Sequence, residues 1–207
     1  MGNYYSSINA EQKDAVGEII NIGFGRAASS LSILIGSPII LRTPEVEVYS
    51  IPELISVLEE HIPDQAVIIH QVFSGTINGD VLLFMNINSA SVLVDLLSGG
   101  NGVSKQLTPS DREALIEVGN ILMNGYIGSF GNLLKLSLNF DLPHLREESL
   151  TEWLGKLNPP DAEPQYSVLV RTEFHIANVK AGGYVALLMD LVSLKTLIET
   201  VERGIPE

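Results

Sequence analysis

Apolar side chains recur at helical spacing in two long stretches of the chain, residues 10–35 and 108–134. In both stretches they return every three or four positions, which is the period of a helix with one buried face. Asn9 and Thr108 stand directly before the two stretches and are favourable N-cap residues, and Pro109 suits the first turn of a helix. We therefore predict a long amphipathic helix in each stretch.

The two predicted helices are parts of a longer internal repeat. With a constant offset and no gaps, residues 8–44 align with residues 107–143. The aligned stretches share residue types at several polar and proline positions: Glu18 and Glu117, Asn21 and Asn120, and Pro44 and Pro143. Further on, GDVLLFMNINS from Gly79 resembles GYVALLMDLVS from Gly183. The pattern therefore predicts a tandem duplication.

Each half continues with shorter elements in the same order. A strand, a short helix, a β-hairpin and a closing helix follow the long helix, and Asn78-Gly79 is a strong hairpin turn. The expected short and closing helices cover residues 53–60, 149–156, 89–98 and 193–203. Because three strands alone form a marginal sheet, we expect the homologous halves, residues 8–100 and 106–203, to share one six-stranded, mostly antiparallel sheet. The expected fold is a single α/β (α+β) domain over residues 1–207 with pseudo-two-fold symmetry.

Gly23, Gly25 and Ala28 lie close to the glycine pattern of a dinucleotide-binding turn. That turn needs a strand before the glycines and a helix that starts at them. Here the glycines lie inside a helical pattern that begins near residue 10, and the second copy has Leu122 and Asn124 at the aligned positions. We therefore interpret them as glycines of a helix and reject a nucleotide site.

A polar stripe follows the face of each predicted helix that is opposite to its apolar face. Its members are Glu11, Asp14, Glu18, Asn21 and Gly25 in the first copy, and Ser110, Glu113, Glu117, Asn120 and Asn124 in the second. Acidic residues alone are typical of a solvated surface. Asn, however, is less favourable than Ala inside a helix by up to about 0.7 kcal/mol. Two equivalent Asn, each three residues after a Glu and therefore on the same face, indicate a functional surface.

The composition narrows the possible functions. The chain has 25 acidic and 12 basic residues and a net charge of −13, which opposes binding to nucleic acid or anionic lipid and favours a basic partner. The absence of Cys excludes disulfides, thiolate metal sites and a catalytic thiol. No ligand spacing connects the His residues, so we expect no metal on this chain: His61, His70, His144 and His175. Neither a secretory signal nor a membrane-spanning apolar run is recognisable, so we expect a cytoplasmic protein.

These features resemble the CheC family of bacterial and archaeal chemotaxis phosphatases, with its CheX and FliY relatives. The family signature is similar to Asp/Ser-x3-Glu-x2-Asn-x22-Pro. The corresponding residues are Asp14, Glu18, Asn21 and Pro44 in the first half, and Glu113, Glu117, Asn120 and Pro143 in the second. Glu113 stands where the family usually has Asp or Ser, which keeps an acid one turn before the Glu. The resemblance covers nearly the whole chain and favours the CheC type, which has two sites.

The resemblance implies a hydrolase that removes the phosphoryl group from an aspartate of a CheY-type response regulator in chemotaxis signal transduction. The Mg²⁺ of the reaction would be bound in the regulator, and this chain would need no cofactor. Asn21 and Asn120 would each enter the regulator and position the attacking water, since a carboxamide is both donor and acceptor. The expected partner-binding residues are Glu18, Glu117, Asp14 and Glu113.

Two other interpretations stay open. The same faces could belong to a non-catalytic module that docks a response regulator, a flagellar switch component or the deamidase CheD, which members of the family bind. The chain could also be a duplicated structural protein, but that leaves the paired motif unexplained. The Asn residues separate these interpretations, because docking alone has little need for an exposed amide in the middle of a helix.

Overall fold

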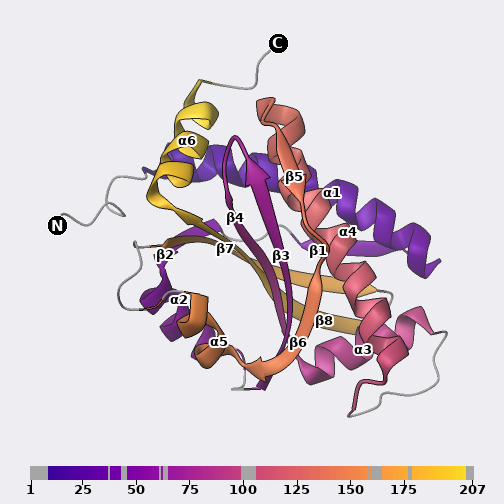
Figure 1. Cartoon of the computed structure of the whole chain (residues 1–207). Coiled ribbons are helices and arrows are strands. Elements are labelled where there is room, and N and C mark those ends of the chain that lie inside the picture. Colours follow the sequence, from indigo (N-terminus) through magenta and orange to yellow (C-terminus); the bar gives the residue numbers. More distant parts are fainter. Residues whose placement is uncertain are drawn as a thin grey trace.

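The fold is built around one antiparallel sheet that carries helices on both faces (Figure 1). The computed structural model describes residues 9–36, 38–42, 46–60, 62, 65–98, 106–157, 159, 165–176 and 179–203. The helices are α1 (Ala10–Ile35), α2 (Ile51–Glu59), α3 (Ile87–Leu97), α4 (Pro109–Leu134), α5 (Leu150–Leu157) and α6 (Leu191–Glu202). The strands are β1 (Ile39–Arg42), β2 (Val46–Ser50), β3 (Gln65–Gly75), β4 (Gly79–Asn86), β5 (Leu138–Phe140), β6 (His144–Ser149), β7 (Gln165–Ile176) and β8 (Val179–Asp190).

The sheet has eight strands within the described residues, so the expected number of six is wrong. The order is β1-β7-β8-β4-β3-β5, with β2 also beside β7 and β6 also beside β3. The expected first strand of each half is divided: β1 and β2 pair with successive parts of β7, and β5 and β6 pair with successive parts of β3. Between β5 and β6 the chain passes through Pro143, which has no N–H for a strand ladder. Residues 43–45, between β1 and β2, lie outside the described ranges.

The two halves of the chain share this sheet. The first half's β1 and β2 pair with β7 of the second half, and the second half's β5 and β6 pair with β3 of the first. In the middle, β4 of the first half pairs with β8 of the second. The element order α-β-β-α-β-β-α occurs in both halves. One mixed α/β fold with an antiparallel sheet is therefore confirmed, while the tandem duplication and the pseudo-two-fold symmetry stay predictions.

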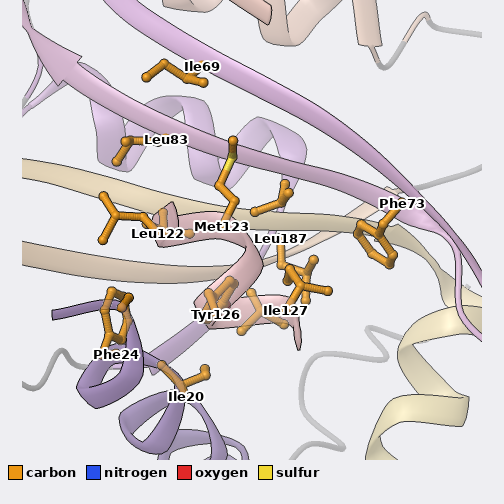
Figure 2. Packing of buried hydrophobic residues seen from close by; sticks show 14 of the residues in the cluster. Ile20, Phe24, Ile69, Phe73, Leu83, Leu122, Met123, Tyr126, Ile127 and Leu187 are labelled. Atoms are coloured by element: carbon orange, nitrogen blue, oxygen red, sulfur yellow. The ribbon is translucent and has the colours of Figure 1, made fainter. Parts of the chain in front are cut away.

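Helices cover both faces of the sheet, because successive side chains of a strand point to opposite sides. Val67 packs in the larger core, to which α1, α3, α4 and α6 contribute. Figure 2 shows Ile69 and Leu83 in the same core. Ile68 and Phe84 point the other way and pack in the smaller core, with α2 and α5. This double burial explains why β3 and β4 contain long apolar runs rather than a strict alternation of polar and apolar residues.

The long helices α1 and α4 cross in close contact on the larger core (Figure 1). A Cβ atom added at Gly23 would lie 2.6 Å from the carbonyl oxygen of Gly125 and 2.8 Å from Ser129 Oγ. One added at Gly125 would lie 2.8 Å from the Cβ atom of Ala27. Gly23 lies inside α1, thirteen residues after the helix begins at Ala10. Helix α4 crosses α1 at this residue. Its lack of a side chain therefore serves helix packing.

Aromatic side chains fill the space around this crossing. The Tyr126 ring lies 5.8 Å from the ring of Phe24 and 5.8 Å from that of Phe130, measured between centroids. Figure 2 shows Phe24 and Ile20 of α1 beside Tyr126 of α4. The Tyr126 hydroxyl is fully buried and has no hydrogen-bond partner among the residues that the structure describes. Burial raises the pKa of this hydroxyl above its ordinary value.

By length and composition alone, α1 is the one helix of the described chain that could cross a membrane. In the fold its apolar side packs in the larger core and its other side carries the acidic stripe. The fold therefore covers one face of α1, and the cytoplasmic location stays a prediction.

Candidate functional site

Helix α1 presents Glu18 and Asn21 to solvent. Its start is fixed by a capping box, in which the Asn9 side chain accepts from the Gln12 N–H at 2.9 Å and Gln12 Oε1 accepts from the Asn9 N–H at 2.8 Å. Ile20 is fully buried, so the same helix turns Glu18 and Asn21 away from the core. Within the described residues, neither of these two side chains forms a hydrogen bond or ion pair.

Helix α4 presents Glu117 to solvent but keeps Asn120 half-buried. Asn124 lies one turn further along, and its Nδ2 donates to Oδ1 of Asn120 at 2.6 Å. The neighbouring Gly119 lies directly on β3, where an added Cβ atom would be 2.7 Å from Cγ2 of Ile69. Asn120 is thus more enclosed than the sequence led us to expect, because α4 lies closely against the sheet at this turn.

The two further acidic residues of the motif precede these pairs by one turn. Asp14 on α1 and Glu113 on α4 are both exposed, and neither forms an ion pair within the described chain. Each motif therefore presents two carboxylates and one carboxamide along one side of its helix. Such a row carries negative charge towards a partner and holds a polar amide at its end.

The prolines of the motif differ in what is known of their surroundings. Pro143 is buried between β5 and β6. Pro44 lies outside the described residues. Pro143 lies where the chain passes from β5 to β6. Within the described residues it forms no hydrogen bond with the side chain of Asn21 or Asn120.

Small and apolar residues lie beside Asn21. Apart from the backbone of its own helix, no atom lies within 4 Å of a Cβ atom added at Gly25. On the other long helix, α4, the same is true of Gly128. Ile22 is 41% exposed. The sequence pattern did not single out Ile22 as a surface residue. Together these residues leave the α1 surface open to close approach.

The two Asn point away from the place where the helices cross. Each residue of a helix turns by about 100°, and Gly23, two residues after Asn21, faces α4. Asn21 therefore lies on nearly the opposite side of α1. Gly125, five residues after Asn120, faces α1, which turns Asn120 well away from α1 by the same geometry. The structure brings each Glu together with its own Asn and leaves the two motifs on different helices.

Within the described residues, the motif residues belong neither to a metal-binding cluster nor to the lining of the pocket described below. Among the described residues, no group of three or more His, Asp or Glu side chains is arranged to hold a metal ion. His70 is paired with Asp80 at 2.6 Å and packs edge-on against Trp153. A pocket of about 410 Å³ is lined in part by Arg112 and Glu147, which form an ion pair at 2.7 Å, and by none of the six motif residues. A metal-free site on this chain stays a prediction.

Comparison with known proteins adds a family context. Residues 11–48 match the model of the CheC-like family, and this segment contains Asp14, Glu18 and Asn21. The resemblance to the CheC-like family is confirmed. The match includes helix α1, where the CheC-like signature was recognised, and continues through β1 into β2. The more specific assignment to the two-site CheC type stays a prediction.

Two curated relatives are phosphatases by name. The chain is 31% identical over 175 residues to the flagellar motor switch phosphatase FliY of Bacillus subtilis (strain 168), which covers 83% of this chain and 43% of that protein. It is 26% identical over 145 residues to the CheY-P phosphatase CheC of the same organism, which covers 68% of each. The chain thus spans less than half of the FliY relative.

Solved structures share the fold of this chain. The crystal structure of Thermotoga maritima FliY superposes with a TM-score of 0.76 at 23% identity, covering 94% of this chain and 98% of that one. The FliM middle domain from H. pylori superposes with a TM-score of 0.67 at 13% identity, covering 93% and 99%. At these identities the likeness concerns the fold alone.

Proposed function

We propose that this chain is a protein phosphatase that hydrolyses the phospho-aspartate of a CheY-type response regulator. The observation that carries the proposal is the presentation of a Glu-x-x-Asn pair on the solvent side of α1, in a segment that matches the CheC-like family. The CheC relative is named as a phosphatase of CheY-P. The second pair on α4 provides a further face of the same kind.

The chemistry asks little of this chain. An acyl phosphate is already activated, so the missing component is a water molecule aligned with the phosphorus–oxygen bond that breaks. The water oxygen bonds to phosphorus, the bond to the aspartyl oxygen breaks, and the products are an aspartate carboxylate and inorganic phosphate. Asn21 or Asn120 would hold the water through its carboxamide, which both donates and accepts. Alignment of this kind lowers the activation free energy by several kcal/mol.

The Glu residues have a different role in this proposal. Glu18 and Glu117 are exposed and unpaired within the described residues, so each is free to meet a lysine near the regulator's phosphorylation site. Exposed ion pairs contribute about 0.2–1 kcal/mol, which is enough to select a docking register but too little for tight binding. Asp14 and Glu113 extend the same acidic row. We propose the deamidase CheD as a further partner of the same acidic faces.

Docking without turnover is the alternative. It is favoured at α4 by the half-buried position of Asn120, which limits the access of a regulator to that amide. A regulator, or a component of the flagellar switch, could then bind the acidic faces without being dephosphorylated. The two proposals differ in whether bound regulator loses phosphate faster than free regulator.

The test is phosphate release from a regulator phosphorylated by a small phosphodonor, with this protein at one twentieth of the regulator concentration. We expect accelerated release over many turnovers. Unchanged release, with a complex detected by titration, would support docking alone and contradict the phosphatase. Efficient hydrolysis of p-nitrophenyl phosphate without any regulator would contradict the mechanism, since it would require a complete active site on this chain.

A further inference from the structure

Asn124 was one member of the polar stripe, but no role follows for it from the motif. In the structure its Nδ2 donates to Oδ1 of Asn120 at 2.6 Å. Both side chains are half-buried on α4. Residues four apart on a helix are neighbours on one face, so this bond is local to the helix and needs no partner protein to form.

The bond restricts the carboxamide of Asn120 without using up its capacity. An Asn side chain has two N–H donors and an oxygen with two lone pairs. One lone pair of Oδ1 accepts from Asn124, and the Nδ2 donors and the second lone pair stay available. The amide plane is thereby oriented before any regulator arrives. Immobilising a flexible side chain costs conformational entropy, and pre-ordering in the free protein removes that cost from the step in which the side chain acts.

Helix α1 lacks this arrangement. The position four residues after Asn21 is Gly25, which has no side chain, and nothing lies within 4 Å of a Cβ atom placed there. Asn21 is exposed and forms no hydrogen bond within the described part of the chain. Its carboxamide therefore has to be ordered by the regulator.

We propose that Asn124 is a positioning residue that pre-orders Asn120 for the reaction, which makes the α4 site intrinsically faster than the α1 site. This inference rests on the proposed phosphatase function. Asn124 acts through Asn120 and does not itself contact the phosphoryl group. Docking is provided by the Glu residues, whereas the Asn120 amide has to be ordered only when it aligns the water in the transition state, so the benefit of pre-ordering appears in kcat rather than in KM.

The activity test isolates the α4 site in an Asn21→Ala background. Asn124→Ala removes the partner of Asn120, and Asn124→Asp keeps the shape but removes the N–H donor. We expect both to lower kcat for regulator dephosphorylation by roughly threefold to tenfold, with KM changed less than twofold. Full kcat in the Asn124→Asp variant, or a change in KM alone, would overturn the inference.

The reciprocal test transfers the arrangement to the α1 site. In an Asn120→Ala background, Gly25→Asn places an amide one turn after Asn21 in open space. We expect a higher kcat than in the matched Gly25→Ala control, which adds a side chain without an amide. Equal kcat in these two variants would contradict the positioning role.

A spectroscopic readout separates this inference from the proposed function. Side-chain ¹⁵N relaxation in the free protein should show the Asn120 amide as rigid and the Asn21 amide as mobile, and Asn124→Ala should make Asn120 mobile. Equal mobility of both amides would overturn the inference whatever the activity. An inactive Asn21→Ala protein with a rigid Asn120 would instead overturn the proposed function of the α4 site.

Discussion

Helices α1 and α4 each have 26 residues and carry the same Glu-x-x-Asn spacing, yet they expose their Asn differently. Asn21 is open to solvent and unpartnered within the described residues, whereas Asn120 is half-buried and bonded to Asn124. Seven residues of α1 are buried, against ten of α4. The deeper helix therefore has less freedom at its Asn.

This difference shows that two copies of one motif do not make two equal sites. At the turn of Asn120, Gly119 brings α4 directly onto β3, while the aligned position in α1 is the bulky Ile20. The α4 motif is thereby held directly against strand β3 of the sheet. The α1 motif lies on a helix that packs mainly against α4. The side chain of Asn21 is exposed there and is therefore less restricted when a partner binds.

The largest expected effect breaks the contact that joins the two helices. Gly23→Ala would place a Cβ atom 2.6 Å from the Gly125 carbonyl oxygen, and such overpacking costs about 1–3 kcal/mol. Gly25→Ala, two residues away, meets open space and gains up to about 1 kcal/mol of helix propensity. Urea denaturation of both variants checks this prediction. A Gly23→Ala protein as stable as Gly25→Ala would show that the helices do not cross at Gly23.

Changes at the acidic residues sharpen the comparison at the level of docking. Glu18→Ala and Glu117→Ala should each raise KM for the regulator about twofold to fivefold at their own site, with kcat retained, because an exposed ion pair contributes about 0.2–1 kcal/mol. The effect should shrink as salt rises. Steady-state kinetics in the Asn120→Ala and Asn21→Ala backgrounds separate the two sites. Glu152→Ala, on α5 at the other face of the sheet, is the matched control and should leave KM unchanged.

The smallest expected effect concerns the buried hydroxyl group of Tyr126 on α4. Helix α1 has no such group at its aligned position. Tyr126 has an unpartnered hydroxyl within the described residues, and the aligned residue of α1 is Ala27. Removing an unsatisfied buried polar group is neutral or stabilising, by less than about 1 kcal/mol here. Thermal denaturation of Tyr126→Phe should therefore give an unchanged or slightly higher Tm. A clear loss of stability would reveal a hydrogen bond to that hydroxyl.

Local patterns in the sequence predicted the helices well. The expected long helices, residues 10–35 and 108–134, correspond to Ala10–Ile35 and Pro109–Leu134. The closing helices begin about two residues earlier than expected, because Asn86 and Asp190, the last residues of β4 and β8, also serve as N-caps. Each of these residues ends a strand and also caps the helix that follows. The sequence pattern therefore does not show at which residue the strand stops and the helix begins.

Long-range pairing was less accessible to sequence reasoning. The division of the first strand of each half depends on which parts of β7 and β3 it meets, and no local pattern contains that register. The motif residues were found from their repeated spacing. The bond between Asn124 and Asn120 was not, since Asn124 was visible only as one polar residue of a stripe.

We infer that Asn side chains on two separate helices, Asn21 on α1 and Asn120 on α4, position the attacking water. The most direct measurement is regulator dephosphorylation at saturating regulator by Asn21→Ala, Asn120→Ala and the double variant, with folding checked by circular dichroism. Independent sites add in rate, so each single variant should keep activity, Asn21→Ala the larger part, and the double variant should fall to the rate of the regulator alone. A single variant as inactive as the double, or a double variant with full activity, would contradict the account.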